Sequence, residues 1–293
     1  MTGRPIASID RVGVVGCGLM GGGIAQVVAQ AGLPTIVVEA DQGLLDRGLA
    51  NIRRSLDGQV EKGRLDAGAR DATWGRLRGS VRLEDLGAVD LVIEAITENV
   101  ALKKETFGRL DRLCAPHALL ATNTSSCTVT ELAAATGRPA QVLGLHFFNP
   151  APVMRLVEVI RTIVTGDATV RAAWSFVQAI GKTPVAAQDT TGFIVNRLLV
   201  PYLLEAIRLL ESGVASKEDI DQAMTLGCGY PMGPFTLLDL VGLDTTLFVA
   251  EVMFQEFREA RFAPPPLLRR MVLAGQLGRK SGKGFYDHAP ASR

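Results

Sequence analysis

Short apolar runs rich in β-branched residues alternate with amphipathic stretches through the first 190 residues of the chain. The runs predict strands, and the stretches, in which apolar residues recur every three or four positions, predict helices. We expect strands at 11–15, 35–39, 80–82, 90–95, 118–122, 141–147, 156–160 and 183–187, and helices at 20–32, 41–63, 99–113, 128–135 and 167–180. Continuous apolar runs, such as residues 91–93, are typical of strands buried on both faces, so the sheet is predicted to be mostly parallel.

Beyond Gln188 the pattern indicates helices alone, at 193–212, 217–226, 235–257 and 267–274. We therefore expect an α/β domain at residues 1–187 followed by an all-helical domain at 188–293. Two domains suit a chain of 293 residues, because one hydrophobic core rarely organises so many. The helix expected at 193–212 is apolar on more than one face, so it needs a second surface to cover it, either in its own domain or on a second subunit.

Two of the expected helices carry polar start signals. Thr128, with Glu131 three residues later, fits a capping box at the start of helix 128–135. Ser216, just before helix 217–226, and Asp219, three residues later, stand in a similar arrangement. We expect these residues to cap their helices.

The composition, with 47% hydrophobic and 21% charged residues, is that of a globular protein and excludes a disordered or fibrous chain. The formal net charge of +1 gives no reason to expect nucleic acid or a membrane as partner. The N-terminus lacks a signal-peptide pattern, and the uncharged segment 12–38 is too rich in glycine for a membrane helix, so we expect a cytoplasmic protein. The four cysteines show neither paired nor metal-ligand spacing, so we expect buried thiols and no metal site.

A glycine-rich turn follows the first expected strand and opens the first expected helix. Its sequence, Gly16-Cys17-Gly18-Leu19-Met20-Gly21, has the G-x-G-x-x-G spacing of a dinucleotide-binding turn. In that motif Gly16 and Gly18 allow a tight turn and close approach to a pyrophosphate, and Gly21 lets the helix pack on the strand. The α/β domain is therefore predicted to be Rossmann-type, with a dinucleotide at this turn.

An acidic residue is expected at the end of the second strand of such a domain, where it binds a ribose diol. Glu39 occupies that position. A carboxylate there accepts from the ribose hydroxyls and repels a 2′-phosphate, so NAD is favoured over NADP. Asp41 could take the same role, although it more naturally caps the next helix.

His146 is the histidine placed for chemistry, whereas His117 and His288 are expected at the surface. It ends the expected strand 141–147, at a strand-to-loop exit where open α/β sheets bind ligands. Glu158 lies in the apolar strand 156–160, where a lone carboxylate needs a buried partner. A His146–Glu158 pair would form a general base, because the carboxylate fixes the tautomer of the imidazole and raises its basicity. The residues alone leave open that both are merely structural.

Several separate motifs together resemble the L-3-hydroxyacyl-CoA dehydrogenase family, whose stand-alone bacterial members act on 3-hydroxybutyryl-CoA in fatty acid metabolism. They are the glycine turn at 16–21, Asn123-Thr124-Ser125-Ser126, His146-Phe147-Phe148-Asn149-Pro150, Leu156-Val157-Glu158-Val159, Gly192-Phe193-Ile194-Val195-Asn196-Arg197, Gly229-Tyr230-Pro231-Met232-Gly233-Pro234 and Gly282-Lys283-Gly284-Phe285-Tyr286. The resemblance runs from about residue 11 to residue 286. It implies NAD-dependent oxidation of a short-chain (S)-3-hydroxyacyl-CoA to the 3-ketoacyl-CoA, and the reverse reduction.

The resemblance also implies roles for single residues. His146 matches the family's base and Glu158 the carboxylate that orients it. Ser125 matches the serine that hydrogen-bonds the C3 oxygen of the substrate. Asn196 matches an asparagine that helps to hold the substrate, and Asn149 one that supports this network.

Further matches concern the cofactor and the CoA moiety. Glu98 and Lys103 match cofactor contacts. The expected cofactor-binding set is Gly16, Gly18, Leu19, Met20, Gly21, Glu39, Glu98, Lys103 and Asn123. Ser55 and Lys62 match positions near CoA, with a surface serine and lysine as the alternative interpretation. The apolar helix at 193–212 resembles the family's subunit interface, which implies a homodimer through the C-terminal domain.

Other interpretations remain. Glu39 stands where many family members carry Asp, and its longer side chain keeps the preference for NAD. The substrate could be a specialised thioester, such as 3-hydroxyadipyl-CoA or one carried by acyl carrier protein. The protein could also be a non-catalytic dinucleotide-binding relative, or a dehydrogenase of the 3-hydroxyisobutyrate or phosphogluconate type. The last uses a catalytic lysine in the helix linking the domains, where this chain has Asn196-Arg197.

Overall fold

The computed structural model describes residues 9–288, and contacts divide the chain into two compact units, Met1–Thr190 and Thr191–Arg293. Each unit has its own hydrophobic core. The sheet of the first unit ends at Gln188, so the expected boundary between 187 and 188 falls on the last strand.

Eight strands of the described part of the first unit form one sheet in the order β3-β2-β1-β4-β5-β6-β7-β8. Their bounds are β1 (Val12–Val15), β2 (Thr35–Val38), β3 (Leu77–Ser80), β4 (Leu91–Glu94), β5 (Leu119–Thr122), β6 (Val142–Phe147), β7 (Leu156–Arg161) and β8 (Thr183–Gln188). Every neighbouring pair is parallel except β6 and β7. The predicted mostly parallel α/β fold is confirmed, and the carboxyl ends of β1, β4, β5 and β6 lie along one edge of the sheet.

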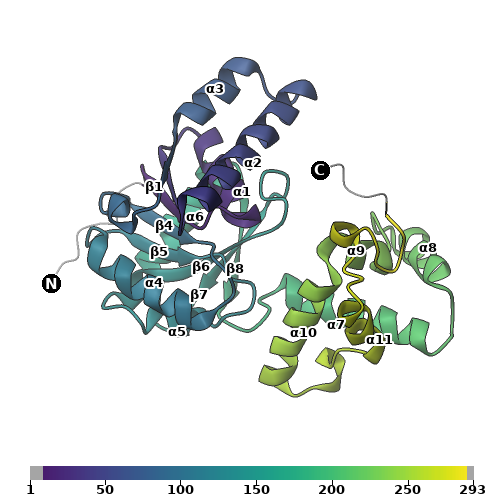
Figure 1. The fold of residues 1–293 in the computed structure, drawn as a ribbon. Coiled ribbons are helices and arrows are strands. Elements are labelled where there is room, and N and C mark those ends of the chain that lie inside the picture. The colour runs from purple at the N-terminus through teal and green to yellow at the C-terminus, as the bar shows by residue number, and fades with distance from the viewer. Residues whose placement is uncertain (1–8, 289–293) are drawn as a thin grey trace. The chain divides into compact units, whose positions relative to one another are not determined.

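Helices cover both faces of this sheet (Figure 1). They are α1 (Leu19–Gln30), α2 (Gln42–Glu61), α3 (Ala67–Gly75), α4 (Val100–Leu113), α5 (Val129–Ala133) and α6 (Asp167–Ala179), with short 3₁₀ turns at Leu83–Leu86 and Pro139–Gln141. One core cluster joins apolar side chains of α1, α2 and α6 to alternate residues of the strands, such as Val12, Val14, Leu91 and Ile93. Helices α4 and α5 pack together on the opposite face.

Three local expectations for this unit are corrected. The strand expected at 80–82 is Leu77–Ser80, and α3 was not expected at all. The side chain of Thr128 does not cap α5; instead the Asp189 carboxylate accepts from the amides of Val129 at 3.0 Å and Thr130 at 2.6 Å. A carboxylate distant in sequence caps the helix in place of the local hydroxyl, and spacing along the sequence cannot reveal such a contact.

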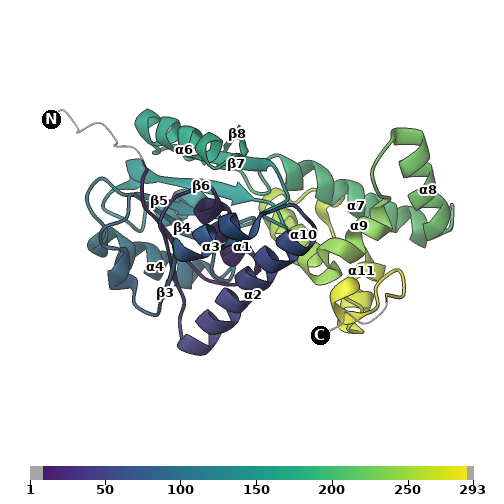
Figure 2. The same ribbon diagram turned by 90° about the horizontal axis from the view of Figure 1, so that it is seen from above.

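The second unit is all-helical within its described residues, as predicted. It contains α7 (Val195–Glu211), α8 (Lys217–Cys228), α9 (Pro234–Val241), α10 (Leu243–Phe257) and α11 (Pro266–Leu273), with 3₁₀ turns at Ala260–Phe262 and Arg279–Ser281. Helices α9 and α11 both lie against α7 (Figure 2). The Ser216 hydroxyl accepts from the Asp219 amide and caps α8, as expected. No helix of the described residues is long and apolar enough to cross a membrane.

The single helix expected at 235–257 is two helices. They are separated at Gly242, whose φ of +103° is a conformation that residues with a side chain rarely adopt.

Buried Asp239 of α9 accepts from the amides of Phe285 and Tyr286 and contacts His288 Nε2 at 2.8 Å. His288, expected at the surface, is therefore tied to the helical core.

Candidate active site

The glycine turn between β1 and α1 is closely packed on one side and open on the other. Gly16 has a φ of +97°, and a β-carbon there would lie 2.7 Å from the carbonyl oxygen of Ala95. A β-carbon on Gly21 would lie 1.9 Å from the carbonyl oxygen of Gly16. Gly18, the N-cap of α1, has no atom within 4 Å of a β-carbon built on it. The turn therefore needs glycine for packing at 16 and 21, and leaves backbone accessible at 18.

The first turn of α1 can receive an anion. No side chain caps it, and the opening amides of any helix lack partners within the helix. Leu19 is 76% exposed and Met20 is half-buried, so both stand at the mouth of the turn. A phosphate would meet the positive end of the helix dipole here.

Glu39 lies against the glycine turn. Its Oε2 accepts from the amide of Cys17 at 2.6 Å, and its Oε1 accepts from the amide of Ala40 at 2.8 Å. A carboxylate accepts about four hydrogen bonds, so both oxygens keep capacity for ribose hydroxyls. Asp41 instead accepts from the amide of Leu44 and caps α2, so of these two carboxylates Glu39 is the one that lies against the glycine turn. The turn, the helix terminus and this carboxylate fit a dinucleotide without a 2′-phosphate.

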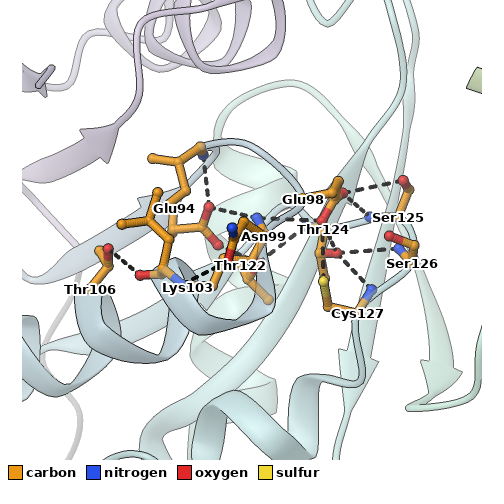
Figure 3. Close-up of polar contacts among 12 residues, drawn as sticks. Glu94, Glu98, Asn99, Lys103, Thr106, Thr122, Thr124, Ser125, Ser126 and Cys127 are labelled. Carbon is orange, nitrogen blue, oxygen red and sulfur yellow. Dashed lines mark hydrogen bonds and ion pairs between the residues drawn. The ribbon is translucent and has the colours of Figure 1, made fainter.

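A buried ion cluster follows β4 (Figure 3). The Lys103 ammonium lies 2.7 Å from Glu94 Oε1 and 3.5 Å from Glu98 Oε2. The side chains of Lys103 and Glu94 are fully buried, whereas that of Glu98 is 28% exposed. A buried ammonium is stable only with close anionic partners, so the two carboxylates fix this lysine.

Glu98 in turn organises the loop after β5 (Figure 3). It accepts from the Ser125 amide at 3.0 Å, from the Ser125 hydroxyl at 3.3 Å and from the Thr124 hydroxyl at 2.7 Å, and the Cys127 thiol lies at 3.3 Å. Burial disfavours the charge on Glu98, but the ammonium of Lys103 and these donors outweigh it and hold the pKa of Glu98 below its ordinary value.

His146 and Glu158 stand directly opposite each other in the antiparallel pair β6–β7. His146 Nδ1 lies 2.6 Å from Glu158 Oε2, and the side chains are 7% and 0% exposed. Asn123, expected at the cofactor, is nearly buried, and its Oδ1 accepts from the amide of Phe147 at 2.8 Å. This bond ties the loop after β5 to the end of β6, next to His146.

Ser55, Lys62 and Asn149 are exposed and line one cavity of about 780 Å³. The cavity lies beside α1 and α2, and Asn149 is the second residue of the loop that follows β6. Arg54 and Arg64 also line it, and none of its described lining residues is acidic. The cavity is therefore cationic and suits an anionic ligand.

Asn196 belongs to the helical unit, where it is half-buried in the first turn of α7. The structure thus brings the other expected residues into four groups within the first unit: the glycine turn with Glu39, the cluster of Lys103, Glu98 and Ser125, the pair His146–Glu158 with Asn123 beside it, and the cavity lined by Ser55, Lys62 and Asn149. Cys17, Cys114 and Cys127 are buried free thiols, whereas Cys228 is exposed. No group of side chains within residues 9–288 has the composition of a metal site.

Sequence reasoning missed Glu94 and Asp189. Glu94 is a lone carboxylate at the end of an apolar strand. The same pattern pointed to Glu158, so it could have pointed to Glu94 as well. Asp189 directly follows β8 in the first unit and shows no comparable signal. Arg54 and Arg64 were also missed, because exposed arginines are common on helix surfaces.

Comparisons with known proteins agree with this geometry. The family model described as "3-hydroxyacyl-CoA dehydrogenase, NAD binding domain" matches residues 11–190, and "3-hydroxyacyl-CoA dehydrogenase, C-terminal domain" matches residues 192–288. The chain belongs to the 3-hydroxyacyl-CoA dehydrogenase family, a family of NAD-dependent oxidoreductases. The cofactor is NAD, as the glycine turn and Glu39 predicted.

Individual relatives cover nearly the whole chain. The 3-hydroxybutyryl-CoA dehydrogenase of Mycobacterium tuberculosis is 50% identical over 96% of this chain and 99% of its own. The human mitochondrial hydroxyacyl-coenzyme A dehydrogenase is 47% identical over 96% of this chain and 91% of its own. The crystal structure of an (S)-3-hydroxybutyryl-CoA dehydrogenase from Ralstonia eutropha superposes with a TM-score of 0.92 at 43% identity, covering 96% of this chain and all of the other. The expected NAD-dependent 3-hydroxyacyl-CoA dehydrogenase activity is confirmed at the level of the family.

Proposed function

We propose that the protein interconverts (S)-3-hydroxybutyryl-CoA and acetoacetyl-CoA, with His146 as general base and general acid. The observation that carries this proposal is the buried His146–Glu158 pair, whose contact is 2.6 Å long. It lies at the edge of the sheet where β1 and β5 lead into the glycine turn and the Ser125 loop. The names of the relatives support the four-carbon acyl group.

In the oxidative direction the proton of the C3 hydroxyl goes to His146. Its Nδ1–H donates to Glu158, so Nε2 carries the lone pair of the neutral ring. As Nε2 takes the proton, the imidazolium is stabilised by the carboxylate. A bound NAD, held at the glycine turn and Glu39, would supply the acceptor for the hydride that leaves C3. In the reverse direction the imidazolium returns its proton to the keto oxygen.

The remaining site residues position the reactants. Ser125 hydrogen-bonds the C3 oxygen, Asn149 supports this network, and Asn196 of the helical unit helps to hold the substrate. Gly16, Gly18, Leu19, Met20 and Gly21 of the turn, together with Glu39, Glu98, Lys103 and Asn123, serve the cofactor, and the fully buried Lys103 does so through the partly exposed Glu98. We accordingly assign cofactor binding to the first domain, 1–187, and substrate binding and dimerisation to the second, 188–293.

The cationic cavity supports CoA as the carrier of the acyl group. CoA bears a pyrophosphate and a 3′-phosphate, and Lys62, Arg54 and Arg64 offer three cations to them. Ser55 lines the same cavity and can donate a hydroxyl hydrogen bond. The phosphopantetheine arm of acyl carrier protein has a single phosphate and needs fewer cations.

Assembly and location complete the proposal. The helical unit exposes large apolar side chains, among them Leu198 at 72%, Leu226 at 77% and Tyr230 at 46%. A homodimer through this unit would cover such surface. The three buried free thiols suit a reducing cytoplasm.

The test is oxidation of NADH by the purified protein with acetoacetyl-CoA, with NADPH in a parallel reaction. We expect turnover with NADH and none with NADPH. Faster turnover of a longer or dicarboxylic acyl-CoA, or of acetoacetyl-acyl carrier protein, would replace the proposed substrate. No turnover with any of these would contradict catalysis and favour a non-catalytic dinucleotide-binding protein.

A further inference from the structure

Glu94 is a fully buried carboxylate at the end of β4 that collects donors from three segments of the chain. Its Oε1 accepts from Lys103 Nζ and from the amide of Ile96, both at 2.7 Å. Its Oε2 accepts from the hydroxyl of Thr122, at the end of β5, also at 2.7 Å. Glu94 thereby joins the ends of two neighbouring strands to the first turns of α4 (Figure 3).

Of the two carboxylates that contact Lys103, Glu94 lies closer to the ammonium. The ammonium is 0.8 Å closer to Glu94 Oε1, at 2.7 Å, than to Glu98 Oε2, at 3.5 Å. Glu94 has no exposed surface, so it has no room to follow a displaced ammonium, whereas the partly exposed Glu98 does. The position of the ammonium is therefore set by Glu94, and Glu98 adjusts to it.

The loop that carries Ser125 depends on Glu98. Both oxygens of Glu98 receive donors from residues 124–127, and no cation other than Lys103 is paired with Glu98 among the described residues. The Thr124 hydroxyl, itself held by Glu98, accepts from the amides of Ser126 and Cys127. A shift of Glu98 would therefore move or loosen the whole turn.

We propose that Glu94 is a positioning residue for the reaction: it fixes Lys103, which fixes Glu98, which fixes the hydroxyl of Ser125. This inference rests on the proposed role of Ser125 at the C3 oxygen. Glu94 touches neither substrate nor cofactor in this scheme. Its effect is transmitted over three contacts, Glu94–Lys103, Lys103–Glu98 and Glu98–Ser125, so it must appear as a change in the Ser125 loop and not only as a change in stability.

The first measurement is hydrogen–deuterium exchange, which requires no activity. In Glu94→Gln the amides of Ser125, Ser126 and Cys127 are expected to exchange faster than in the wild type. The matched control is Asp111→Asn, which also removes a carboxylate paired with a cation, Arg138 at 2.7 Å, at the far end of α4. The control is expected to leave exchange in residues 124–127 unchanged.

The second measurement is a double-mutant cycle in kcat. Misplacement of a reacting group by a fraction of an ångström to 1 Å costs about 10-fold to 100-fold, so Glu94→Gln is expected to lower kcat in that range. In the Ser125→Ala background the same change is expected to have little further effect, because the residue through which Glu94 acts is gone. Asp111→Asn is expected to keep wild-type kcat.

Each outcome decides a separate point. Independent, multiplicative losses in Glu94→Gln and Ser125→Ala would overturn the inference, as would unchanged exchange at 124–127. An active-site role for Ser125 fails if Ser125→Ala keeps wild-type kcat, and the inference then fails with it. If Glu94→Gln does not fold, Glu94→Asp keeps the charge but retracts the carboxylate, and the same loosening of the loop and loss of kcat are expected.

Discussion

A side chain on Gly21 would collide with the carbonyl oxygen of Gly16, because its β-carbon would lie only 1.9 Å away. The carbonyl belongs to the turn, so either the turn or α1 would have to shift. Gly21→Ala is therefore expected to lower the free energy of unfolding by about 1–3 kcal/mol. Chemical denaturation checks this value.

Gly18→Ala provides the matched comparison. Its methyl group would meet no protein atom within 4 Å, so the free energy of unfolding is expected to change by no more than about 0.5 kcal/mol. The methyl group would nevertheless occupy the space through which a pyrophosphate approaches the backbone. NADH titration should show weakened binding in this stable variant. Wild-type affinity would show that the cofactor does not approach the turn at Gly18.

Removing the negative charge of Glu158 should impair proton transfer without unfolding the site. In Glu158→Gln an amide oxygen can still accept from His146 Nδ1, but it no longer stabilises the imidazolium. We expect kcat to fall by about 100-fold or more, within the range typical of general acid–base catalysis. NADH affinity should be unchanged.

His146→Ala is the stronger variant of the same test. It removes the proposed base, so turnover should be lost while NADH binding survives. Wild-type turnover in His146→Ala would exclude His146 as the base. Loss of NADH binding in Glu158→Gln would show a structural role for the pair.

The stabilisation provided by ionised Glu98 should disappear on acidification. Burial disfavours its charge, but the Lys103 ammonium and the donors of residues 124–127 hold its pKa below the ordinary value of 4.5. Because the folded pKa lies below the unfolded one, this stabilisation is complete above about pH 4.5 and is lost as pH falls through the folded pKa. The difference in unfolding free energy between the wild type and Glu98→Gln should be constant near neutral pH and shrink in that acidic range. A difference independent of pH would contradict the assignment.

The cavity cations should affect only substrates that carry nucleotide phosphates. Lys62→Ala is expected to raise KM for acetoacetyl-CoA about tenfold, equivalent to about 1.4 kcal/mol. KM for acetoacetyl-pantetheine, which lacks those phosphates, should be unchanged. Lys104→Ala is the control, since Lys104 is an exposed lysine paired with Glu131 on the other face of the sheet. If Lys62→Ala raised KM equally for both substrates, the cavity would not be the binding site of the CoA phosphates.

Local patterns in the sequence predicted the sheet, the order of its helices and the glycine turn with Glu39. They did so because each depends on residues close in sequence or on the period of buried positions. Strand β3, with the sequence Leu-Arg-Gly-Ser and no fully buried residue, lacks the apolar run that marks the other strands. Helix α3 buries only Thr73, so it has no apolar face to detect.

Other features depend on contacts between segments far apart in sequence. Gly242 lies within an apolar, helix-like run, and only its positive-φ backbone conformation in the folded unit separates α9 from α10. Lys103 resembles a surface lysine of an amphipathic helix, but packing buries it beside Glu94. Sequence spacing placed His146 and Glu158 on separate strands, and the antiparallel register that sets them face to face is a property of the assembled sheet.

That register has a consequence for how such enzymes diversify. Four paired positions, from Gly144 opposite Ile160 to Phe147 opposite Val157, align β6 and β7, and the connecting segment 148–155 lies outside this ladder. Residues of that segment, including Asn149 and Val153, border the cationic cavity. Apart from Asn149, residues of this segment can therefore change between relatives while the proton-transfer pair stays aligned. Selection on how the carrier of the acyl group is bound can act on positions such as Val153 without disturbing the residues that move the proton.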